Sequence, residues 1–464
     1  MKRPPEQTMK SLEGRTISIL GLGASGMAAA RLALAKGGEV YVSDRRAEPS
    51  TAARGAQLRE LGARVELGDH DLERIARSDT VVVSPGIPPD APLLRALREA
   101  GVSWVSEPEF AFHFLPGELI AVTGTNGKTT TAALAAHLLQ TAGVETGLGG
   151  NIGAAFGPPA SDLALLEPAP DWCVVELSSF QLADIVDFRP AIGVLTNLAP
   201  DHLDRYPSLE AYYGDKARLF KNATPDSRWV LNGDDPAVAA LAGDVPGERF
   251  RFSLREGTNA EAYLGEDGEL VLDLDGRESS LLHQDRLPLL GRHNVANALA
   301  AALAAGLAGA HPGSLAQGLE SFPALPHRLE PVGSARGLRW VNDSKATNVA
   351  ATVGALQSLA GPLVILLGGK DKGEDLTPLR EAVHSGVRGA VLYGEARGRM
   401  ARSLEGSTEL HVVDGSFEAA VDVAARLAVP GDVLLLSPAC SSFDMFPNYE
   451  ARGGRFAALA RGDG

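Results

Sequence analysis

Short apolar runs alternate with alanine- and leucine-rich stretches along most of the chain, and polar or glycine-rich clusters follow many of these runs. Thr16–Leu20, Thr80–Val83 and Val433–Leu436 have the length and composition of buried strands. Intervening stretches such as 132–140 are rich in helix-forming residues. Strands that alternate with helices predict an α/β fold built on parallel sheets.

The length of the chain predicts more than one domain. A chain of 464 residues exceeds the size at which a single hydrophobic core stops growing, roughly 250–300 residues, so about three domains are expected. Changes in pattern place the boundaries near Ser106 and Leu325. The expected domains are residues 1–106, 107–324 and 325–464, with a small antiparallel sheet over 259–282.

Composition and charge narrow the class of protein. The net charge of −15 argues against a nucleic-acid partner, whose phosphates favour a basic surface. Cys173 and Cys440 are too few for a disulfide framework, which fits a reducing cytoplasm, and Cys173 is expected in the core. Residues 1–10 lack the apolar segment of a signal peptide, and the apolar run 298–310 is too short to span a bilayer. We therefore expect a cytoplasmic protein without a membrane partner.

The stretch 120–131, Ile-Ala-Val-Thr-Gly-Thr-Asn-Gly-Lys-Thr-Thr-Thr, carries the strongest chemical signal. Gly124 and Gly127 permit backbone angles at which N–H groups converge on an anion, and the following helix directs its positive end to the same point. Lys128 can contact outer phosphate oxygens, and the Thr129 hydroxyl can coordinate Mg²⁺. The pattern predicts a nucleotide triphosphate loop; an ordinary glycine turn before a helix is the alternative.

The first segment contains a second glycine-rich turn. A G-x-G-x-x-G pattern from Gly21 to Gly26 follows a strand, and Asp44 ends the next strand. Nicotinamide-binding folds share this pattern, although any nucleotide diphosphate can use the same turn. Taken alone, it would suggest an NAD-dependent oxidoreductase. Gly86 lies in a rigid turn after another strand, at the edge where ligands of open α/β sheets bind.

Four residues of the middle segment are candidates for chemistry. Glu176 ends a buried strand, where a phosphate-loop enzyme places a metal carboxylate; it could also merely terminate the strand. His202 follows another strand end beside two aspartates, which favours a role at a metal or phosphate site. Lys216, judged from the residues alone, is a solvated lysine on a helix. Asn294 opens an alanine-rich helix as a cap or a base contact.

Polar clusters also follow the strands of the third segment, which is typical of sites and not of cores. These clusters are 326–330, 342–348, 369–372 and 437–444.

In their order along the chain, these motifs resemble those of the Mur ligase family, which builds the peptide stem of bacterial cell-wall precursors. The resemblance extends from Gly21 to Arg455. Within the family, the branch that adds D-glutamate is most similar in the stretches 342–348 (Asn-Asp-Ser-Lys-Ala-Thr-Asn), 366–369 (Leu-Leu-Gly-Gly) and 437–444 (Ser-Pro-Ala-Cys-Ser-Ser-Phe-Asp).

The resemblance implies three α/β domains. The N-terminal domain would be Rossmann-like and bind the UDP substrate, the central one would hold ATP on a phosphate-loop ATPase-type parallel sheet, and the C-terminal one would be Rossmann-like and bind the amino acid. The first glycine turn would then hold a uridine nucleotide in place of NAD. The residues that match uridine-nucleotide contacts are Ser25, Gly26, Asp44, Arg46 and Gly86.

The resemblance also implies ATP and two Mg²⁺ ions as cofactors. The residues that match ATP contacts are Gly124, Thr125, Asn126, Gly127, Lys128, Thr129, Thr130, Asn294, Arg328 and Asp343. The implied metal ligands are Thr129, Glu176, His202 and Lys216. Lys216 matches a lysine that family members carry as a carbamate, formed with CO₂, which would hold the second ion. The expected catalytic residues are Lys128, Glu176, His202 and Lys216.

The implied substrates are all small molecules: UDP-N-acetylmuramoyl-L-alanine, D-glutamate and ATP. Asn151 matches a substrate contact. The residues that match the D-glutamate pocket or lie beside it are Lys345, Thr347, Lys372, Ser442, Phe443 and Tyr449. We expect a monomer with no nucleic-acid or membrane partner.

The implied reaction is amide-bond formation. Transfer of the γ-phosphoryl group of ATP would convert the substrate carboxylate to an acyl phosphate, which the amine of D-glutamate would attack. The alternatives are another Mur ligase or a folylpolyglutamate synthase-like ligase, an NAD-dependent oxidoreductase, and a non-catalytic nucleotide-binding protein.

Overall fold

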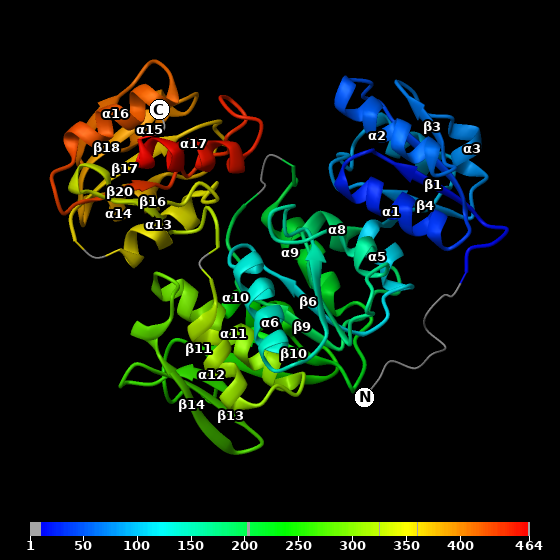
Figure 1. Cartoon of the computed structure of the whole chain (residues 1–464), viewed down its shortest axis with the longest axis horizontal. Coiled ribbons are helices and arrows are strands. Elements are labelled where there is room, and N and C mark those ends of the chain that lie inside the picture. The colour runs from blue at the N-terminus through cyan, green and yellow to red at the C-terminus, as the bar shows by residue number, and fades with distance from the viewer. Residues whose placement is uncertain (1–10, 202–204, 324, 360, 463–464) are drawn as a thin grey trace. The chain divides into compact units, whose positions relative to one another are not determined.

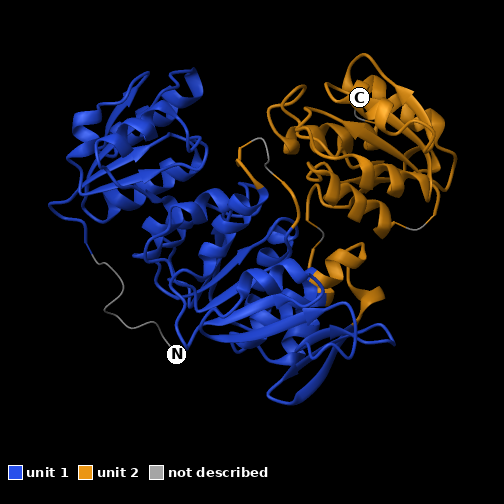
Figure 2. Ribbon diagram, turned by 180° about the vertical axis from the view of Figure 1, so that it is seen from behind, with its two compact units in different colours: residues 1–198, 209–282, 297–319 blue, residues 199–208, 283–296, 320–464 orange. Residues whose placement is uncertain are grey.

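The structure is a computed structural model that describes residues 11–201, 205–323, 325–359 and 361–462. It divides into two compact units, coloured separately in Figure 2. The first unit holds the described parts of Met1–Leu198, Leu209–Leu282 and Asn297–Leu319, and the second holds those of Ala199–Ser208, His283–Ala296 and Glu320–Gly464.

The first unit begins with a five-stranded parallel sheet in the order β3-β2-β1-β4-β5 (Figure 1). Its strands are β1 (Thr16–Leu20), β2 (Glu39–Asp44), β3 (Arg64–Leu67), β4 (Thr80–Val83) and β5 (Val105–Ser106). The helices of this segment are α1 (Ala24–Ala35), α2 (Pro49–Glu60), α3 (Leu72–Ala76), α4 (Pro92–Glu99) and α5 (Glu107–Phe112). Val82 joins one hydrophobic core, whereas Val81 and Val83 join another. Alternate strand residues point to opposite faces, so helices cover both faces.

A nine-stranded sheet follows in the order β14-β13-β12-β11-β10-β9-β6-β8-β7. Its strands are β6 (Glu118–Thr123), β7 (Thr146–Gly150), β8 (Trp172–Glu176), β9 (Ile192–Leu195), β10 (Arg228–Asn232), β11 (Glu248–Ser253), β12 (Ala262–Leu264), β13 (Glu269–Leu274) and β14 (Arg277–His283). The helices of this segment are α6 (Lys128–Thr141), α7 (Ala160–Leu163), α8 (Ser179–Ala183), α9 (Leu209–Ala217), α10 (Pro236–Ala242), α11 (Arg292–Leu307) and α12 (Pro312–Ser321). Cys173 of β8 is fully buried, as predicted.

The strands of 259–282 are only partly as predicted. β12 pairs antiparallel with β13, but it also pairs parallel with β11. These strands therefore extend the main sheet and do not form a separate small one. Backbone groups at a sheet edge need partners, and β12 supplies them for β11.

The second unit holds a six-stranded sheet in the order β15-β16-β20-β17-β18-β19. Its strands are β15 (Glu330–Gly333), β16 (Arg339–Asn342), β17 (Leu363–Gly368), β18 (Val387–Tyr393), β19 (Glu409–Val412) and β20 (Val433–Leu436). The helices are α13 (Val349–Ser358), α14 (Thr377–His384), α15 (Arg397–Ser403), α16 (Phe417–Leu427) and α17 (Tyr449–Arg461). All strand pairs are parallel except β15 with β16. The predicted α/β class is confirmed, while the three domain boundaries stay predictions.

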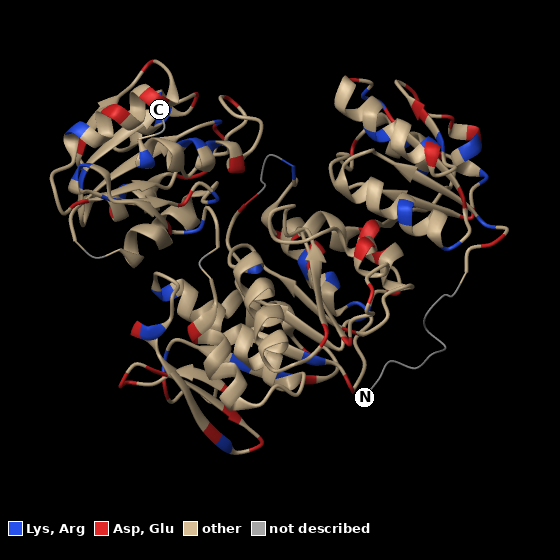
Figure 3. Ribbon diagram, viewed as in Figure 1, with Lys and Arg blue, Asp and Glu red and all other residues tan. Residues whose placement is uncertain are grey.

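Charged residues of both signs are interspersed along the elements of each unit (Figure 3). Among the described residues, no helix combines the length and the apolar character needed to cross a membrane.

Candidate functional site

The predicted triphosphate loop lies between β6, which ends at Thr123, and α6, which begins at Lys128. Gly124 has φ 144° and Gly127 has φ 80°, which side chains disfavour. A Cβ at Gly124 would lie 2.0 Å from Thr196 Oγ1, and one at Gly127 would lie 2.2 Å from Asn297 Oδ1. Both positions require glycine, and a strand, turn and helix in this order form an anion-binding loop.

Two lysine side chains converge on this loop. Lys128 Nζ donates to the carbonyl oxygens of Gly124 at 3.0 Å and Thr125 at 2.7 Å. Lys216 Nζ of α9 donates to Gly124 O at 2.6 Å and lies 4.7 Å from the centroid of the Tyr212 ring. Lys216 is 1% exposed, so its interpretation from the residues alone as a solvated lysine is wrong. The helix face that carries it is packed toward the loop.

Thr129 and Glu176 lie side by side where α6 begins and β8 ends. Thr129 Oγ1 donates to Glu176 Oε2 at 2.7 Å, and both residues are buried. The adjacent parallel strands β6 and β8 bring these two predicted metal ligands together. Asn151, which follows β7, is exposed and donates its N–H to Glu176 O at 2.9 Å. His202 lies outside the described residues.

Residues that the sequence analysis did not assign form hydrogen bonds with the loop. Thr196 Oγ1 and Asn197 Nδ2 both donate to Asn126 O, at 2.6 and 2.9 Å, and Asn126 N donates to Asn197 Oδ1 at 2.9 Å. Tyr212 Oη donates to Thr125 Oγ1 at 3.3 Å. Thr130 is buried at the start of α6. The sequence signal for Thr196 and Asn197 was their place directly after a strand that neighbours β6.

The residues expected to contact uridine gather at the carboxyl ends of β1, β2 and β4. Asp44, the last residue of β2, accepts from Leu22 N at 2.7 Å and from Arg46 N at 2.8 Å. Burial alone would raise the pKa of Asp44, but hydrogen bonds from Arg46 and Leu22 outweigh it and lower the pKa. A Cβ at Gly26 would lie 1.9 Å from Gly21 O, so the turn passes close to α1.

Further residues at this edge of the sheet come from α1 and from the end of β4. Ser84 Oγ donates to Gly21 O at 3.2 Å, Ser25 is half-buried in α1, and Gly86 is exposed in the turn after β4. The strand order reverses between β1 and β4, which is where open α/β sheets bind ligands. His70 Nδ1, which the sequence analysis missed, lies 2.8 Å from Ser43 Oγ at the same edge.

In the second unit, three polar loops follow the neighbouring strands β16, β20 and β17. Asp343, directly after β16, accepts from Ser437 Oγ at 2.8 Å and from Leu329 N at 3.2 Å. Burial raises the pKa of Asp343 to about 7, although Ser437, Leu329 and Arg328 act in the opposite direction. Arg328 is half-buried in the turn before β15.

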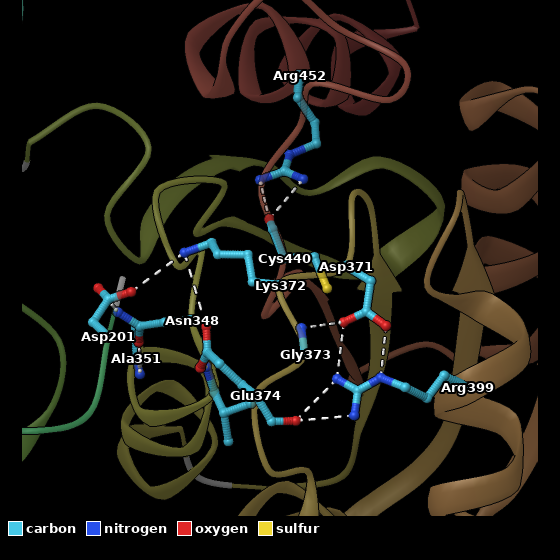
Figure 4. A network of polar contacts seen from close by, with 11 residues as sticks. Asp201, Asn348, Ala351, Asp371, Lys372, Gly373, Glu374, Arg399, Cys440 and Arg452 are labelled. Carbon is cyan, nitrogen blue, oxygen red and sulfur yellow. Dashed lines mark hydrogen bonds and ion pairs between the residues drawn. The ribbon is translucent and has the colours of Figure 1, made fainter. Parts of the chain in front are cut away.

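Arg452 of α17 joins two of these loops. It is fully buried, donating from Nε to Ser344 Oγ at 3.0 Å and from its terminal nitrogens to Ser344 O at 2.9 Å and Cys440 O at 3.1 and 3.2 Å. The contacts with Cys440 appear in Figure 4. Lys345 Nζ lies 3.8 Å from the ring centroid of Tyr449, the first residue of α17. The sequence analysis missed Arg452, because an arginine in a helix normally lies on the surface.

A polar network surrounds Lys372 in the loop after β17 (Figure 4). Lys372 Nζ lies 3.4 Å from Asp201 Oδ1 and 3.8 Å from Glu374 Oε1. The adjacent Asp371 carboxylate accepts from Arg399 Nε at 2.6 Å and from a terminal nitrogen of Arg399 at 2.9 Å. Arg399 thereby fixes the loop that presents Lys372.

The remaining candidate residues of the second unit differ in how far they are buried. Thr347 is half-buried and Ser442 is buried, but Phe443 is 68% exposed. Asn294 lies inside the first turn of α11, and its Nδ2 donates to Leu290 O at 2.8 Å. An N-cap side chain accepts a hydrogen bond from the helix, so the cap interpretation of Asn294 is wrong.

Glu109, His113 and Asp187 form a possible metal cluster elsewhere in the first unit. The Glu109 carboxylate already accepts backbone N–H groups from residues 186 to 188 at 2.8–3.0 Å. These hydrogen bonds attach the loop before β9 to helix α5, which indicates a structural role for Glu109.

Three sheets with helices along the chain between their strands, and a glycine turn at which Lys128 and Lys216 meet, are typical of α/β nucleotide-binding enzymes. Three family models match in order: Mur ligase MurD-like, N-terminal domain (15–106), Mur ligase middle domain (122–305) and Mur ligase, glutamate ligase domain (327–440). The chain belongs to the Mur ligase family.

Relatives match along the whole chain. The UDP-N-acetylmuramoylalanine--D-glutamate ligase of Geotalea uraniireducens (strain Rf4) is 42% identical over 97% of this chain and 98% of its own. Among solved structures, UDP-N-acetylmuramate-alanine ligase MurC from Thermotoga maritima matches with a TM-score of 0.62 and 20% identity, over 97% of this chain and 100% of its own. A pseudomurein peptide ligase type C from Methanothermus fervidus also has a TM-score of 0.62 and 20% identity, over 96% and 99%. These two structures show the shared fold.

Proposed function

We propose that this chain catalyses the ATP-dependent addition of D-glutamate to UDP-N-acetylmuramoyl-L-alanine, a step in peptidoglycan precursor synthesis. The observation that carries the proposal is 42% identity, over 97% of the chain, to a relative named for ligation of D-glutamate. The triphosphate loop and the polar strand ends of the third sheet supply groups that such a reaction needs.

A carboxylate resists attack by an amine because its leaving group would be oxide. In the proposed mechanism, a carboxylate oxygen of the uridine substrate attacks the γ-phosphorus of ATP, and ADP leaves. The amine of D-glutamate then attacks the acyl carbon, and phosphate leaves as the amide forms. Lys128 and the N–H groups of the loop offset the negative charge that develops on the transferred phosphoryl group.

The residues at the loop fit a Mg²⁺ ion, because this ion prefers oxygen donors and Thr129 Oγ1 lies 2.7 Å from Glu176 Oε2. We assign Thr129, Glu176 and His202 as metal ligands. Bound Mg²⁺ would neutralise phosphate charge during transfer. We assign a second Mg²⁺ to Lys216 in its carbamate form.

The carbamate has a test that does not depend on activity. The neutral amine of Lys216 would form an N–C bond to CO₂ and lose a proton. After equilibration with ¹³C-bicarbonate, nuclear magnetic resonance should show a carbamate carbon in the native chain and none in Lys216→Met. A native chain without this signal contradicts the assignment.

The other site assignments extend the same proposal. The uridine nucleotide would contact Ser25, Gly26, Asp44, Arg46 and Gly86, with Asn151 as a further substrate contact. ATP would contact residues 124–130 together with Asn294, Arg328 and Asp343. D-Glutamate would be held by Lys345, Thr347, Lys372, Ser442, Phe443 and Tyr449. We propose a cytoplasmic monomer with the domains 1–106, 107–324 and 325–464.

The activity is tested by phosphate release from ATP in the presence of UDP-N-acetylmuramoyl-L-alanine, with one amino acid in each reaction. We expect release with D-glutamate and not with L-glutamate, L-lysine or meso-diaminopimelate. Release with another amino acid would assign the chain to a sister activity of the family. Release without any amino acid would show ATP hydrolysis uncoupled from ligation.

A further inference from the structure

The residues assigned above to the amino-acid pocket include no anion that could pair with the ammonium group of the substrate. D-Glutamate carries two carboxylates and one ammonium group. Lys345, Lys372, Thr347 and Ser442 offer hydrogen-bond donors, which suit the carboxylates. An ammonium group needs an acceptor, best an anion, and this inference rests on the proposed function.

The Asp201 carboxylate lies directly beside Lys372. Asp201 is 6% exposed, its Oδ1 lies 3.4 Å from Lys372 Nζ, and its Oδ2 accepts from Asn348 Nδ2 at 3.0 Å (Figure 4). Asp201 belongs to the second unit, as do Lys372 and Asn348.

The orientation of Asn348 indicates that this carboxylate position is built into the fold. Asn348 caps α13, and its Oδ1 accepts from Ala351 N at 2.8 Å. The acceptor end of the amide is therefore fixed against the helix, and its Nδ2 donor must face the other way. Asp201 supplies the acceptor on that side.

The charges around Lys372 favour one more cation. Asp201 and Glu374 are both within 3.8 Å of a single ammonium group. The separation of 3.4 Å between Lys372 and Asp201 exceeds the roughly 2.7–2.9 Å of a strong charge-assisted hydrogen bond. Burial raises the pKa of Glu374, and the charge of Asp201 adds to the increase.

We propose that Asp201 binds the ammonium group of the amino-acid substrate. When the substrate binds, the ion pair between Lys372 and Asp201 separates. Lys372 then pairs with a substrate carboxylate, and Asp201 pairs with the substrate ammonium group. Neither buried charge loses its counter-charge, which is the condition for burying ions without a large penalty. Asp201 thus selects an amino acid over a dicarboxylate of similar length.

The test compares D-glutamate with glutarate, which has both carboxylates and no amine. The full chain, with UDP-N-acetylmuramoyl-L-alanine and a non-hydrolysable ATP analogue, is titrated with each ligand, and Kd is measured by ligand-observed nuclear magnetic resonance. We expect the native chain to prefer D-glutamate by about tenfold or more, as a charge-assisted contact would give. In Asp201→Asn this preference should fall to within about twofold.

Glu374→Gln is the matched control, because it removes the same charge from the other side of Lys372 and can still accept from Val349 N, which now lies 2.9 Å from Glu374 Oε2. It should keep the preference for D-glutamate. A ratio unchanged in Asp201→Asn would overturn the proposal. If both ligands bind Asp201→Asn more weakly by the same factor, Asp201 has a structural role. If both bind more tightly by the same factor, Asp201 only competes with substrate carboxylates for Lys372. An equal loss of the preference in Glu374→Gln would also overturn the proposal. The preference would then depend on the total negative charge around Lys372 and not on a direct contact with Asp201.

Failure of the proposed function would be visible separately. If the native chain releases no phosphate with D-glutamate but does so with another amino acid, the same titration is made with that amino acid and its analogue without the α-amine. The role of Asp201 is then supported or overturned by the same ratio.

Discussion

The triphosphate loop of the second sheet and the polar end of the third sheet are built in different ways. The loop is one continuous stretch between β6 and α6, and its shape depends on Gly124 and Gly127. The polar end of the third sheet combines loops after β16, β17 and β20. Arg452 from α17 holds two of these loops together.

This difference shows where specificity can vary. A loop made by local backbone geometry binds phosphate, which nucleotide substrates share. A pocket made of separate loops can change one loop while the others keep their positions. Under the proposed function, the shared phosphate chemistry therefore lies on contiguous residues, and the choice of amino acid lies on dispersed ones.

The largest expected effect comes from Arg452→Met. Removing the guanidinium leaves Ser344 O and Cys440 O buried without these donors, so the free energy of unfolding should fall by about 3–5 kcal/mol. Chemical denaturation measures it. Arg455→Met is the control in the same helix, because Arg455 pairs with Glu418 at the surface and should cost under about 1 kcal/mol. Similar losses of stability in both variants would contradict the role of Arg452 in joining the two loops.

Substitution of Lys128 in the loop and of Lys372 at the third sheet should affect different kinetic parameters. Lys128→Met should lower kcat for phosphate release by roughly 10²–10³-fold, because one donor to the transferred phosphoryl group is lost. Lys372→Met should instead raise KM for D-glutamate by about tenfold or more and leave KM for ATP near its native value. Steady-state kinetics with each substrate varied in turn would check both. An increase of KM for ATP in Lys372→Met would contradict the assignment of separate roles to the two regions.

A smaller effect is expected from glycine exchange in and beside the loop. Gly124→Ala places a Cβ 2.0 Å from Thr196 Oγ1 at φ 144°, which should destabilise the chain by about 1–3 kcal/mol. Gly214→Ala is the matched control, because Gly214 lies in α9 with open space around it. It should stabilise the chain by about 0.5–1 kcal/mol. Thermal unfolding distinguishes the two signs, and stabilisation by Gly124→Ala would contradict the strained geometry.

The smallest effect concerns pH. Burial raises the pKa of Asp343 to about 7, above the value near 3.9 for an unfolded chain. The folded state then holds a proton that the unfolded state releases, so this group favours folding at low pH and the contribution fades as pH rises through 7. From pH 6 to pH 8 the loss is about 1.4 kcal/mol.

Asp343→Asn should remove this pH-dependent component, since the amide oxygen can still accept from Leu329 N while the amide nitrogen donates to Ser437 Oγ, which is an acceptor as well as a donor. The free energy of unfolding at several pH values would show it as a difference between variant and native chain. A difference that does not change between pH 6 and pH 8 would contradict the raised pKa.

Local patterns predicted much of this protein. Apolar runs gave the strands, glycines at fixed spacing gave the triphosphate loop, and strand ends gave Glu176 and Asp44. Lys216 shows the limit of such reasoning, because its residue type and helix predict a solvated side chain, and only the packing of α9 buries it. Asn294 likewise fits the composition of a cap but lies inside α11.

The strands, the helices and the glycine turn before α6 follow from the amino-acid sequence alone, because each depends on residues close together in the chain. Tertiary structure alone decided that Arg452 is buried between two loops and that Asp201 lies 3.4 Å from Lys372, 171 residues away in the chain. Whether a charged side chain faces water or another charge depends on which elements pack against it. That choice is a property of the folded chain and not of any short stretch of it.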